Sequence, residues 1–441
     1  MTRLAAARKV VEISRADTLR LVGRVGLPLV AKGLIVRRPR TVGLLARLGT
    51  DQWLVTELRR LRERYGPALL VLRLPRRTVA IPLDGHDVER VLRDTPATFS
   101  PASREKEGAL SHFQPHGVLI SEGDDRVDRR RFTERVLDTP HELHRLAYPM
   151  NAVIRQECAR LLADRTELAW PEFADAWWRI VRRIVLGDGA RDDQELISLL
   201  HALRSDGNWS YLRPTRNRVR VRFQRRLRAH LDRTEPGSLA GLVASVCAPR
   251  TDPLSQVAHW LFAFDAAGMT AARTVALLAT HPDVLRRVRD EHAHGEPDEP
   301  QPLRVTRAAV LETLRLWPTT PAILRDSTVD TDWSATPLPR GTTFVVLAPY
   351  FHRDEQTLDY ANTFTPDAWL DGRAASTPTL LPFSAGPATC PGRNLVLHVI
   401  ATTVATMVAD TGFTVVSRQR LTPLPATLDP FHLRFTTTPH R

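Results

Sequence analysis

The chain has 441 residues, enough for two or three domains, but no Gly/Ser linker, internal repeat or low-complexity tract divides it. Its three cysteines, Cys158, Cys247 and Cys390, are too few and too scattered for a disulfide framework, so a reducing compartment is the default. The net charge of +13 suits an anionic membrane surface or an acidic protein partner, whereas the lack of an aromatic-basic platform excludes nucleic acid as the expected partner.

The first 50 residues contain a basic amphipathic segment at residues 20–37. Arg24, Pro28 and Lys32 interrupt it, so it lacks the roughly 20 unbroken apolar residues of a spanning helix. No secretory signal peptide is visible, and we therefore expect a cytoplasmic protein without a transmembrane segment. The segment either packs on the body of the protein or makes peripheral contact with a membrane. We treat residues 1–50 as this segment and residues 51–441 as a single domain.

Residues 51–65 have the pattern of an amphipathic helix, and residues 69–73 and 78–82 are predicted strands of a small sheet. Residues 95–121 are rich in Pro, Ser and His with few periodic positions, which predicts a long ordered loop. The 33 prolines of the chain exceed the roughly 5% average and indicate many such loops between helices.

A helix is predicted to open at Gly123, with acidic residues in its first turn as the helix dipole prefers. Arg126 and Arg130 lie four apart on one face of this helix. A guanidinium is a suitable fork for a carboxylate, although an arginine cluster on a helix is usually a solvated face.

Residues 142–185 and 192–203 have helical periodicity. Residues 206–214 interrupt it, and residues 216–231 form a very basic helix. Taken alone, this helix-loop-helix is a surface hairpin whose aromatics pack locally.

Residues 253–280 are the longest predicted helix, extending roughly 40 Å at 1.5 Å per residue. The middle of this helix is apolar on every face, as in a helix through a protein core, and His259, Asp265 and Arg273 argue against a membrane span. Ala267 and Gly268 are small enough to let a flat cofactor lie against the backbone, or they serve ordinary helix packing.

Glu312 and Arg315 are three apart on a predicted helix and share a face. Such a pair occurs by chance in many helices, where it is exposed and worth little.

Cys390 lies in a turn made by Gly and Pro, directly before an apolar helical run at residues 395–408. Backbone N–H groups and the helix N-terminus would stabilise its thiolate, and Phe383 would shield a metal-bound sulfur from water. The alternative for this segment alone is a buried structural cysteine.

Residues 381–393 resemble the haem-ligand loop of the cytochrome P-450 family, F-x-x-G-x-R/H-x-C-x-G. Phe383, Gly386, Cys390 and Gly392 occupy four of its five fixed positions, and Ala388 replaces the basic one. The resemblance covers residues 50 to 440. It implies a mainly α fold with small β-sheets, with haem b (iron protoporphyrin IX) held between the long central helix and the Cys390 loop.

By this resemblance, Cys390 is the axial metal ligand, and Arg325 joins Arg126 and Arg130 as a haem propionate contact. Glu312 and Arg315 match the buried E-x-x-R pair, whose third member is missing because Ala368 stands at the arginine position.

The family's distal motif, A-G-x-D/E-T, is matched at Ala267 and Gly268, but Thr270 takes the acidic position and Ala271 the alcohol position. The usual acid-alcohol relay is therefore missing as a pair. Asp265 or Thr270 would supply a proton, unless Asp265 is a core residue satisfied by local hydrogen bonds. The substrate pocket is expected to include Phe99, Phe113, Trp209, Thr320, Ala322 and Ile323, with Leu110 and Pro115 as further candidates. By the same resemblance, the helix-loop-helix before residue 231 would match the family's mobile lid, with Trp209 at the entrance, unless it is the surface hairpin described above.

The favoured function is a bacterial, soluble haem-thiolate monooxygenase that oxidises a small, largely apolar molecule in specialised metabolism. Its electrons would come from a separate ferredoxin and ferredoxin reductase, and an acidic ferredoxin suits the basic chain. Two alternatives are a peroxide-dependent oxidase or peroxygenase, and a catalytically degenerate accessory protein that binds haem or ligand.

Overall fold

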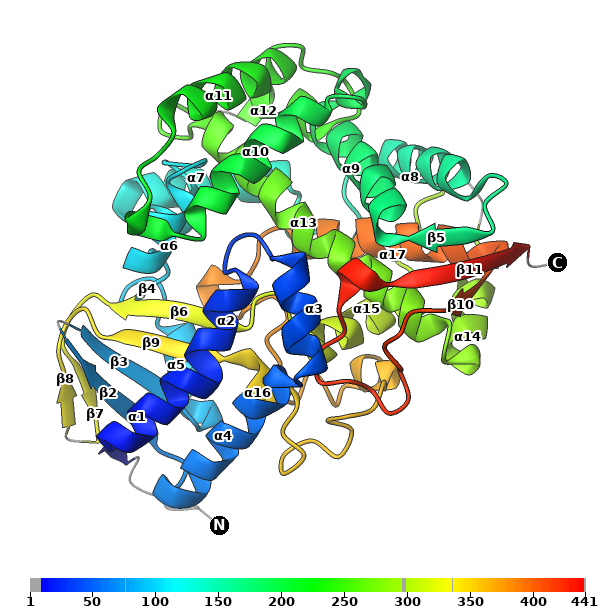
Figure 1. Cartoon of the computed structure of the whole chain (residues 1–441). Coiled ribbons are helices and arrows are strands. Elements are labelled where there is room, and N and C mark those ends of the chain that lie inside the picture. The colour runs from blue at the N-terminus through cyan, green and yellow to red at the C-terminus, as the bar shows by residue number, and fades with distance from the viewer. Residues whose placement is uncertain (1–8, 76, 247, 296–298, 335, 440–441) are drawn as a thin grey trace.

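The computed structural model describes residues 9–439, apart from residues 76, 247, 296–298 and 335. A six-stranded sheet and the N-terminal helices gather on one side, and a larger body of helices forms the rest (Figure 1). The fold is therefore mainly helical with small sheets, as the sequence predicts.

The six-stranded sheet has the strand order β1-β2-β3-β9-β6-β4. β1 runs parallel to β2 and β9 runs parallel to β3, while the other neighbours are antiparallel. The strands are β1 (Val10–Glu12), β2 (Leu69–Leu74), β3 (Arg77–Pro82), β4 (Phe99–Ser100), β6 (Ala322–Ser327) and β9 (Thr343–Leu347). The two strands predicted at residues 69–73 and 78–82 are thus confirmed as β2 and β3.

Side chains alternate across the sheet as the two-residue period of a strand requires. Leu70 and Leu72 face helix α4 (Thr50–Tyr65), where they pack with Leu58. Leu69 and Val71 point to the opposite face and pack with Phe99 and Phe344. Both faces of β2 are therefore buried.

Two smaller sheets complete the β structure. One contains β10 (Thr411–Val415), β11 (Arg434–Pro439) and β5 (Glu167–Ala169), and the other pairs β7 (Thr331–Trp333) with β8 (Thr336–Leu338).

Helix α13 (Pro253–Leu278) runs through the middle of the helical body (Figure 1). It packs against α9 on one side and against α15 and α17 on another. By length and composition α13 could cross a membrane, but 78% of its most apolar window is buried within the protein, as in the core helix of a soluble fold. The other long helices are α7 (Gly123–Val136), α8 (Ala147–Leu162), α9 (Trp170–Leu186), α10 (Gln194–Gly207), α11 (Asn217–Leu231), α14 (Pro282–Ala293), α15 (Arg304–Leu316) and α17 (Arg393–Ala409).

Short helices cover the sheet and connect the longer ones. They are α1 (Arg15–Leu21), α2 (Leu27–Lys32), α3 (Pro39–Arg47), α5 (Gly85–Arg93), α6 (Arg104–Leu110), α12 (Leu239–Val246) and α16 (Ala348–His352).

Two predicted stretches differ from the structure. The helical pattern at residues 142–185 is broken by β5, which pairs with β11 more than 260 positions away, a contact that local periodicity cannot indicate. The loop predicted at residues 95–121 contains β4 and α6. The apolar side of α6 has only Gly108, Ala109 and Leu110 as buried residues, too short a run to show a helical period.

The described part of the N-terminal segment joins the body, because β1 extends the sheet and α2 packs beside α3. Residues 1–8 lie outside the described part of the chain, and the boundary at residue 50 stays a prediction. Cys158 and Cys390 are free cysteines, whereas Cys247 is outside the described residues.

Candidate active site

The loop that ends in Cys390 is held by its own backbone. The Cys390 N–H donates to the Phe383 carbonyl at 3.0 Å, and the Thr389 N–H donates to the Gly386 carbonyl at 2.9 Å. Gly386 has φ +68°, and a Cβ on it would lie 2.2 Å from the Leu92 carbonyl oxygen. Only glycine fits this close approach, so the motif's glycine has a steric cause.

Burial raises the pKa of the Cys390 thiol, and the Gly392 N–H together with the charges of Arg130 and Arg393 opposes that rise. These three groups favour the thiolate, the form that binds metals. The described residues contain no group of three His, Cys, Asp or Glu side chains that would hold a metal ion. A metal bound by Cys390 therefore needs its other ligands from a cofactor.

Glu312 and Arg315 on α15 form a fully buried ion pair. Arg315 Nη2 lies 2.6 Å from Glu312 Oε1, and Arg315 Nε lies 2.8 Å from Oε2. Arg315 also donates to the carbonyls of His352 and Ala361 at 2.7 and 2.9 Å. The pair thus ties α15 to two later segments of the chain.

The motif pairs Glu312 and Arg315 with a third residue, an arginine, and this chain has Ala368 at that position. In the structure the neighbouring Trp369 takes the place of that arginine. Its indole Nε1 donates to Glu312 Oε2 at 2.9 Å, and the Thr365 N–H donates to Oε1 at 2.9 Å. Both carboxylate oxygens are therefore satisfied without a second arginine.

His352 connects the Glu312–Arg315 pair to the cysteine loop. Its Nε2 accepts a hydrogen bond from the Leu381 N–H at 2.8 Å, so its Nδ1 carries the proton and donates to the Arg315 carbonyl at 3.2 Å. Leu381 is the first residue of the loop that ends in Cys390. The neutral imidazole thus positions the start of that loop.

Stability should fall in acid because His352 is buried as the neutral form. Burial, with the nearby Arg315 charge, lowers its pKa from 6.5 to about 3, so the unfolded chain binds a proton below pH 6.5 that the folded chain does not. We expect this residue to lower the free energy of unfolding by about 1.4 kcal/mol per pH unit between pH 6.5 and 4. His398 and His259, with pKa values lowered to about 3 and about 4, act in the same direction.

Urea unfolding at pH 7.0, 6.0 and 5.0 measures this slope. Replacing the exposed His86 with Gln is the control and should leave the slope unchanged. Stability that stays constant or rises toward pH 5 contradicts the neutral assignment.

A cavity of about 1610 Å³, counted with its opening, separates Cys390 from α13. The wall contributed by α13 includes Ala263, Ala266, Ala267 and Thr270, spaced three and four apart on one face of the helix. Thr270 Oγ1 donates to the Ala266 carbonyl at 3.0 Å. Small side chains and one hydroxyl therefore face the cysteine across the cavity.

The face of α13 corrects the assignment of Gly268 and places Thr270, a proton donor proposed from the sequence, in the cavity wall. A Cβ on Gly268 would lie 2.7 Å from Trp177 Cδ1, so Gly268 serves the packing of α9 on α13 and not the wall of the cavity. Ala271 is fully buried in the helical core, whereas the Thr270 hydroxyl lines the cavity. The alcohol of this site is thus Thr270, one position before the one that the motif predicted.

Asp265 also lines the cavity, but its carboxylate is engaged. Arg204 Nη2 on α10 lies 2.5 Å from Asp265 Oδ2 and also donates to the Ile35 carbonyl at 3.3 Å. Asp265 therefore faces the cavity as half of an ion pair.

Three predicted cations meet at one edge of the cavity. Arg126 donates to the Val118 carbonyl at 2.9 Å, Arg130 donates to the Thr389 carbonyl at 2.8 Å, and Arg325 reaches Ser384 Oγ at 3.3 Å. Among the described residues, Arg126 and Arg325 have no carboxylate partner. Burial, followed by the charge of Arg126, lowers the pKa of Arg325 to about 10, as expected for cations that lack an anion.

Lys106 is a fourth cation at this edge, and sequence reasoning missed it. Its Nζ donates to the carbonyls of Pro101 and Leu324 at 2.8 and 3.1 Å. Burial, followed by the charge of Arg325, holds its pKa well below the usual value. The composition could have pointed to Lys106, because the chain contains only three lysines among its many arginines: Lys9, Lys32 and Lys106.

The predicted pocket residues divide into two groups. Thr320, Ala322, Ile323 and Phe383 line the cavity, as expected. Phe99 instead packs in the sheet core, 4.9 Å from the Phe344 ring centroid, and Phe113 packs in the helical core with Phe262. Neither phenylalanine lines the cavity. His259, which was not assigned to the pocket, does line it and has no partner for Nδ1 among the described residues.

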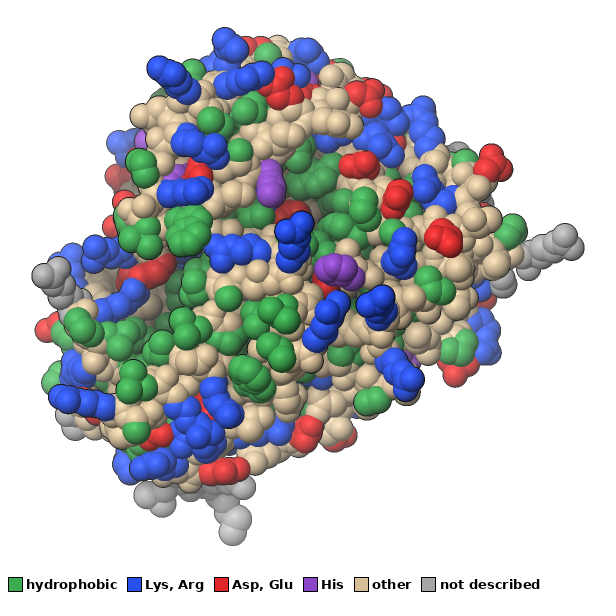
Figure 2. Space-filling view, in the orientation of Figure 1, with side chains coloured by type: hydrophobic (Ala, Val, Ile, Leu, Met, Phe, Trp, Pro, Cys, Tyr) green, Lys and Arg blue, Asp and Glu red, His purple; other side chains and the backbone are tan. Residues whose placement is uncertain are grey.

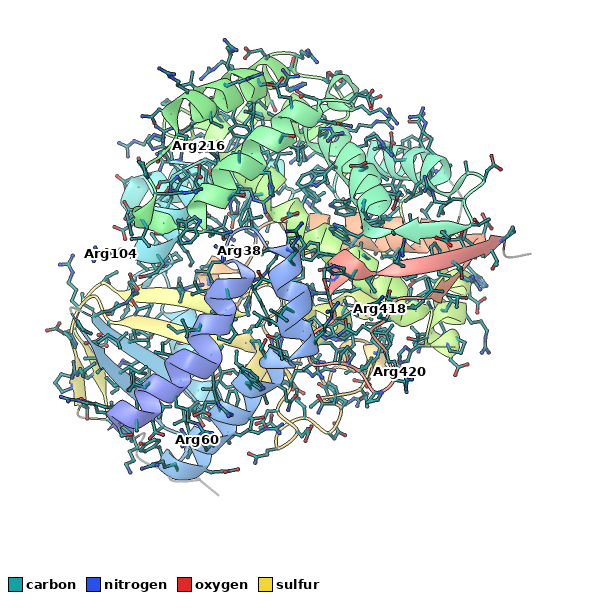
Figure 3. All side chains as sticks on the ribbon, in the orientation of Figure 1. Arg38, Arg60, Arg104, Arg216, Arg418 and Arg420 are labelled. Atoms are coloured by element: carbon teal, nitrogen blue, oxygen red, sulfur yellow. The ribbon has the colours of Figure 1, made fainter. Side chains whose placement is uncertain are left out.

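The turn after α10 lies on the surface and not in the cavity wall. Trp209 is 48% exposed and stacks under the Arg38 guanidinium at 5.4 Å. Tyr211 packs under Arg104 at 5.7 Å. Figure 3 labels both arginines: Arg38 lies beside the N-terminal helices, and Arg104 lies at α6, between the six-stranded sheet and the helical body. The two contacts attach this turn to neighbouring segments, and the predicted lid motion stays untested.

Comparisons with known proteins agree with this geometry. Residues 262–428 match the family model described as Cytochrome P450. A cyclooctat-9-en-7-ol 5-monooxygenase from Streptomyces melanosporofaciens is 32% identical over 40% of this chain and 38% of its own length. An isoflavone 2'-hydroxylase from Medicago truncatula is 32% identical over 33% of this chain and 30% of its own length. The matches thus span well under half of these relatives.

Solved structures match almost the whole chain. The retinoic acid-bound cyanobacterial CYP120A1 has a TM-score of 0.72 at 17% identity, covering 86% of this chain and 93% of that one. A zebrafish cytochrome P450 with abiraterone has a TM-score of 0.69 at 20% identity, covering 87% and 98%. At these identities the likeness establishes the fold.

The residues around the cavity fit the haem that this fold implies. Cys390 offers a sulfur on one side, and the alanines of α13 leave space on the other. Arg126 and Arg325 are buried and Lys106 is half-buried, none of the three has an ion-pair partner among the described residues, and haem carries two carboxylates.

Proposed function

Because its fold and the match over residues 262–428 make the chain a member of the cytochrome P450 family, we propose that it is a haem-thiolate monooxygenase of the bacterial, soluble type. The observation that carries the proposal is the single cavity that contains the Cys390 sulfur, the alanine face of α13 and a cluster of unpaired cations.

In this proposal the haem is iron protoporphyrin IX, and it supplies the redox chemistry with the Cys390 thiolate as its axial ligand. Arg126, Arg130, Arg325 and Lys106 bind its carboxylates through charge-assisted hydrogen bonds. Phe383 lies beside the cysteine in the cavity wall and excludes water from the sulfur. Thr270 holds a proton at the opposite wall.

Replacing Thr270 with Val should lower the rate of product formation by about 100-fold or more, which is the usual contribution of a positioned proton donor. The change keeps the side chain's shape and removes the only hydroxyl that α13 contributes to the cavity wall. The measurement is the rate of product formation, recorded together with the product formed per nicotinamide oxidised. Thr274, which donates to the Thr270 carbonyl from the buried side of the helix, is the control position as Thr274→Val. Equal product yields in wild type and Thr270→Val contradict the role.

We propose a small, largely apolar substrate, because most of the exposed surface of the cavity wall is apolar, with Phe262, Ala263, Leu119 and Ile323 among the residues that contribute to it. A role in specialised metabolism is supported by the name of the cyclooctat-9-en-7-ol 5-monooxygenase relative.

A ferredoxin with its reductase is the proposed electron source. Arg131, Arg135 and Arg393 are exposed near the Cys390 loop and suit an acidic partner. The proposed location is the cytoplasm. Peripheral membrane contact through the N-terminal helices is a further proposal, supported by exposed Leu19, Leu27 and Leu44 and by the apolar face flanked by Lys and Arg in Figure 2.

The Asp265–Arg204 ion pair favours a second candidate, a peroxide-dependent oxidase, because it engages the one carboxylate that lines the cavity among the described residues. Turnover of a panel of apolar compounds with ferredoxin, its reductase and NADPH, compared with turnover in peroxide alone, separates the two. Product only with the electron-transfer proteins supports the monooxygenase. Product with peroxide alone supports the alternative, and haem binding without product in either system indicates an accessory protein.

A further inference from the structure

A second cavity of about 780 Å³, counted with its opening, adjoins the one that contains Cys390. Its walls come from the N-terminal helices, the C-terminal half of α13, the segment after α15 and the chain near residue 430. Its charged lining residues are Lys32, Arg37, Asp51, Arg273 and Arg353. We refer to it as the basic cavity.

The basic cavity and the active-site cavity share one wall. Arg37, Met269 and Thr319 line both. Arg37 Nη2 donates to the Thr319 carbonyl at 2.8 Å, and its Nη1 donates to the Gly33 carbonyl at 2.8 Å. These three residues therefore lie between the two spaces, and an elongated molecule that displaces the side chain of Met269 or Arg37 reaches both.

Positive charge exceeds negative charge in the basic cavity. Four cations line it against the single carboxylate of Asp51, which is occupied by Lys32 and by the Thr427 hydroxyl. Arg273 donates to the carbonyls of Leu428 and Trp317 at 2.9 and 3.3 Å. The hydrogen bonds of Arg273 therefore go to neutral backbone carbonyls and not to a carboxylate.

Among the described residues, Arg37, Arg273 and Arg353 have no ion-pair partner. Arg353 instead donates to Asn362 Oδ1 at 2.9 Å and to the Leu316 carbonyl at 3.2 Å. Burial lowers the pKa of Arg273 to about 10, with a further contribution from Arg37. Cations buried without an anion are costly, and a bound oxyanion would relieve that cost.

We propose that the basic cavity binds an anionic oxyacid group, a carboxylate or a phosphate, on the substrate whose apolar part occupies the active-site cavity. This inference rests on the proposed function, because it names the substrate class of that same site. Arg273 follows Thr270 by three residues on α13, about 4.5 Å along the helix axis, so a compact molecule spans both cavities.

The haem carboxylates do not account for the basic cavity. The cations assigned to them, Arg126, Arg130, Arg325 and Lys106, line the active-site cavity and do not line the basic cavity. Of the two lysines that line these two cavities, Lys106 lies at the haem edge of the active-site cavity and Lys32 lies in the basic cavity.

Calorimetric titration of the haem-loaded protein in a buffer without phosphate tests the proposal, with decanoate, decan-1-ol and inorganic phosphate as probes. Wild type should bind decanoate at least tenfold more tightly than decan-1-ol. Arg273→Met should abolish this preference, and Arg273→Lys should restore part of it. Arg218→Met removes an exposed arginine on α11 and is the matched control, which should keep the wild-type preference.

Equal affinities for decanoate and decan-1-ol in wild type overturn the proposal, as does a preference that survives in Arg273→Met. Phosphate binding that depends on Arg273, without a decanoate preference, assigns the cavity to free anions and also overturns it. If Arg273→Met does not fold, Arg37→Met replaces it. The titration needs no turnover, so its outcome is independent of whether the chain proves to be a monooxygenase.

Discussion

Cys390→Ser is expected to abolish the red-shifted Soret band of the reduced, carbon monoxide-treated protein. The band requires a thiolate on the haem iron, and the described residues around the cavity offer no second cysteine. Serine keeps the size of the side chain, so the loop held by the Phe383 carbonyl and by Gly386 should persist. Monooxygenase activity should fall to the background of free haem.

Cys158→Ser is the matched control for this experiment. Cys158 is a free, buried cysteine on α8, and burial raises the pKa of its thiol to about 12, so it is not a thiolate. Its replacement should leave the band in place. A band that survives in Cys390→Ser, or the absence of haem from folded wild type reconstituted with haemin, contradicts the assignment of Cys390.

The cysteine loop was predictable because its geometry depends on local residues. Gly386 has φ +68°, and the Cys390 N–H donates to the Phe383 carbonyl seven residues earlier, so both features lie within the loop itself. The Glu312–Arg315 pair was predictable for the same reason, since three-residue spacing puts two side chains on one helix face. The mainly helical class followed from the long periodic stretches.

Contacts between distant segments were not predictable from one sequence. Trp369 reaches Glu312 from 57 positions away, and its role does not depend on the arginine that the motif specifies. Phe99 looked like a loop residue, but pairing of β4 with β6 places it in the sheet core. Lys106 belongs to a helix too short for periodicity to reveal.

The distal motif misled for a physical reason. A helix face is set by what packs on its other side, and Trp177 lies close to Gly268 with its indole donating to the Phe264 carbonyl at 2.8 Å. This packing orients α13 so that Thr270 faces Cys390's cavity and Ala271 does not. A motif aligned by letters alone carries no information about that rotation.

Arg315→Met is expected to lower the free energy of unfolding by about 3–5 kcal/mol, because it leaves the Glu312 carboxylate buried without its counter-ion. Haem binding should also weaken. Arg315 donates to the His352 carbonyl, and His352 accepts a hydrogen bond from the N–H of Leu381, the first residue of the cysteine loop. Urea unfolding measures the change in the free energy of unfolding, and the haem content of the purified protein measures the effect on the site. Trp369→Phe removes one hydrogen bond to the same carboxylate and should cost about 1–3 kcal/mol.

Arg286→Met provides the matched comparison on the neighbouring helix α14. Arg286 and Asp283 have the same three-residue spacing, with Nη2 and Oδ1 2.5 Å apart, but both side chains are exposed, 69% and 89%. Solvent screens that pair, so its loss should cost less than about 1 kcal/mol and leave haem content unchanged. If Arg286→Met and Arg315→Met lower the free energy of unfolding and the haem content by similar amounts, the buried Glu312–Arg315 pair does not hold the cysteine loop in place.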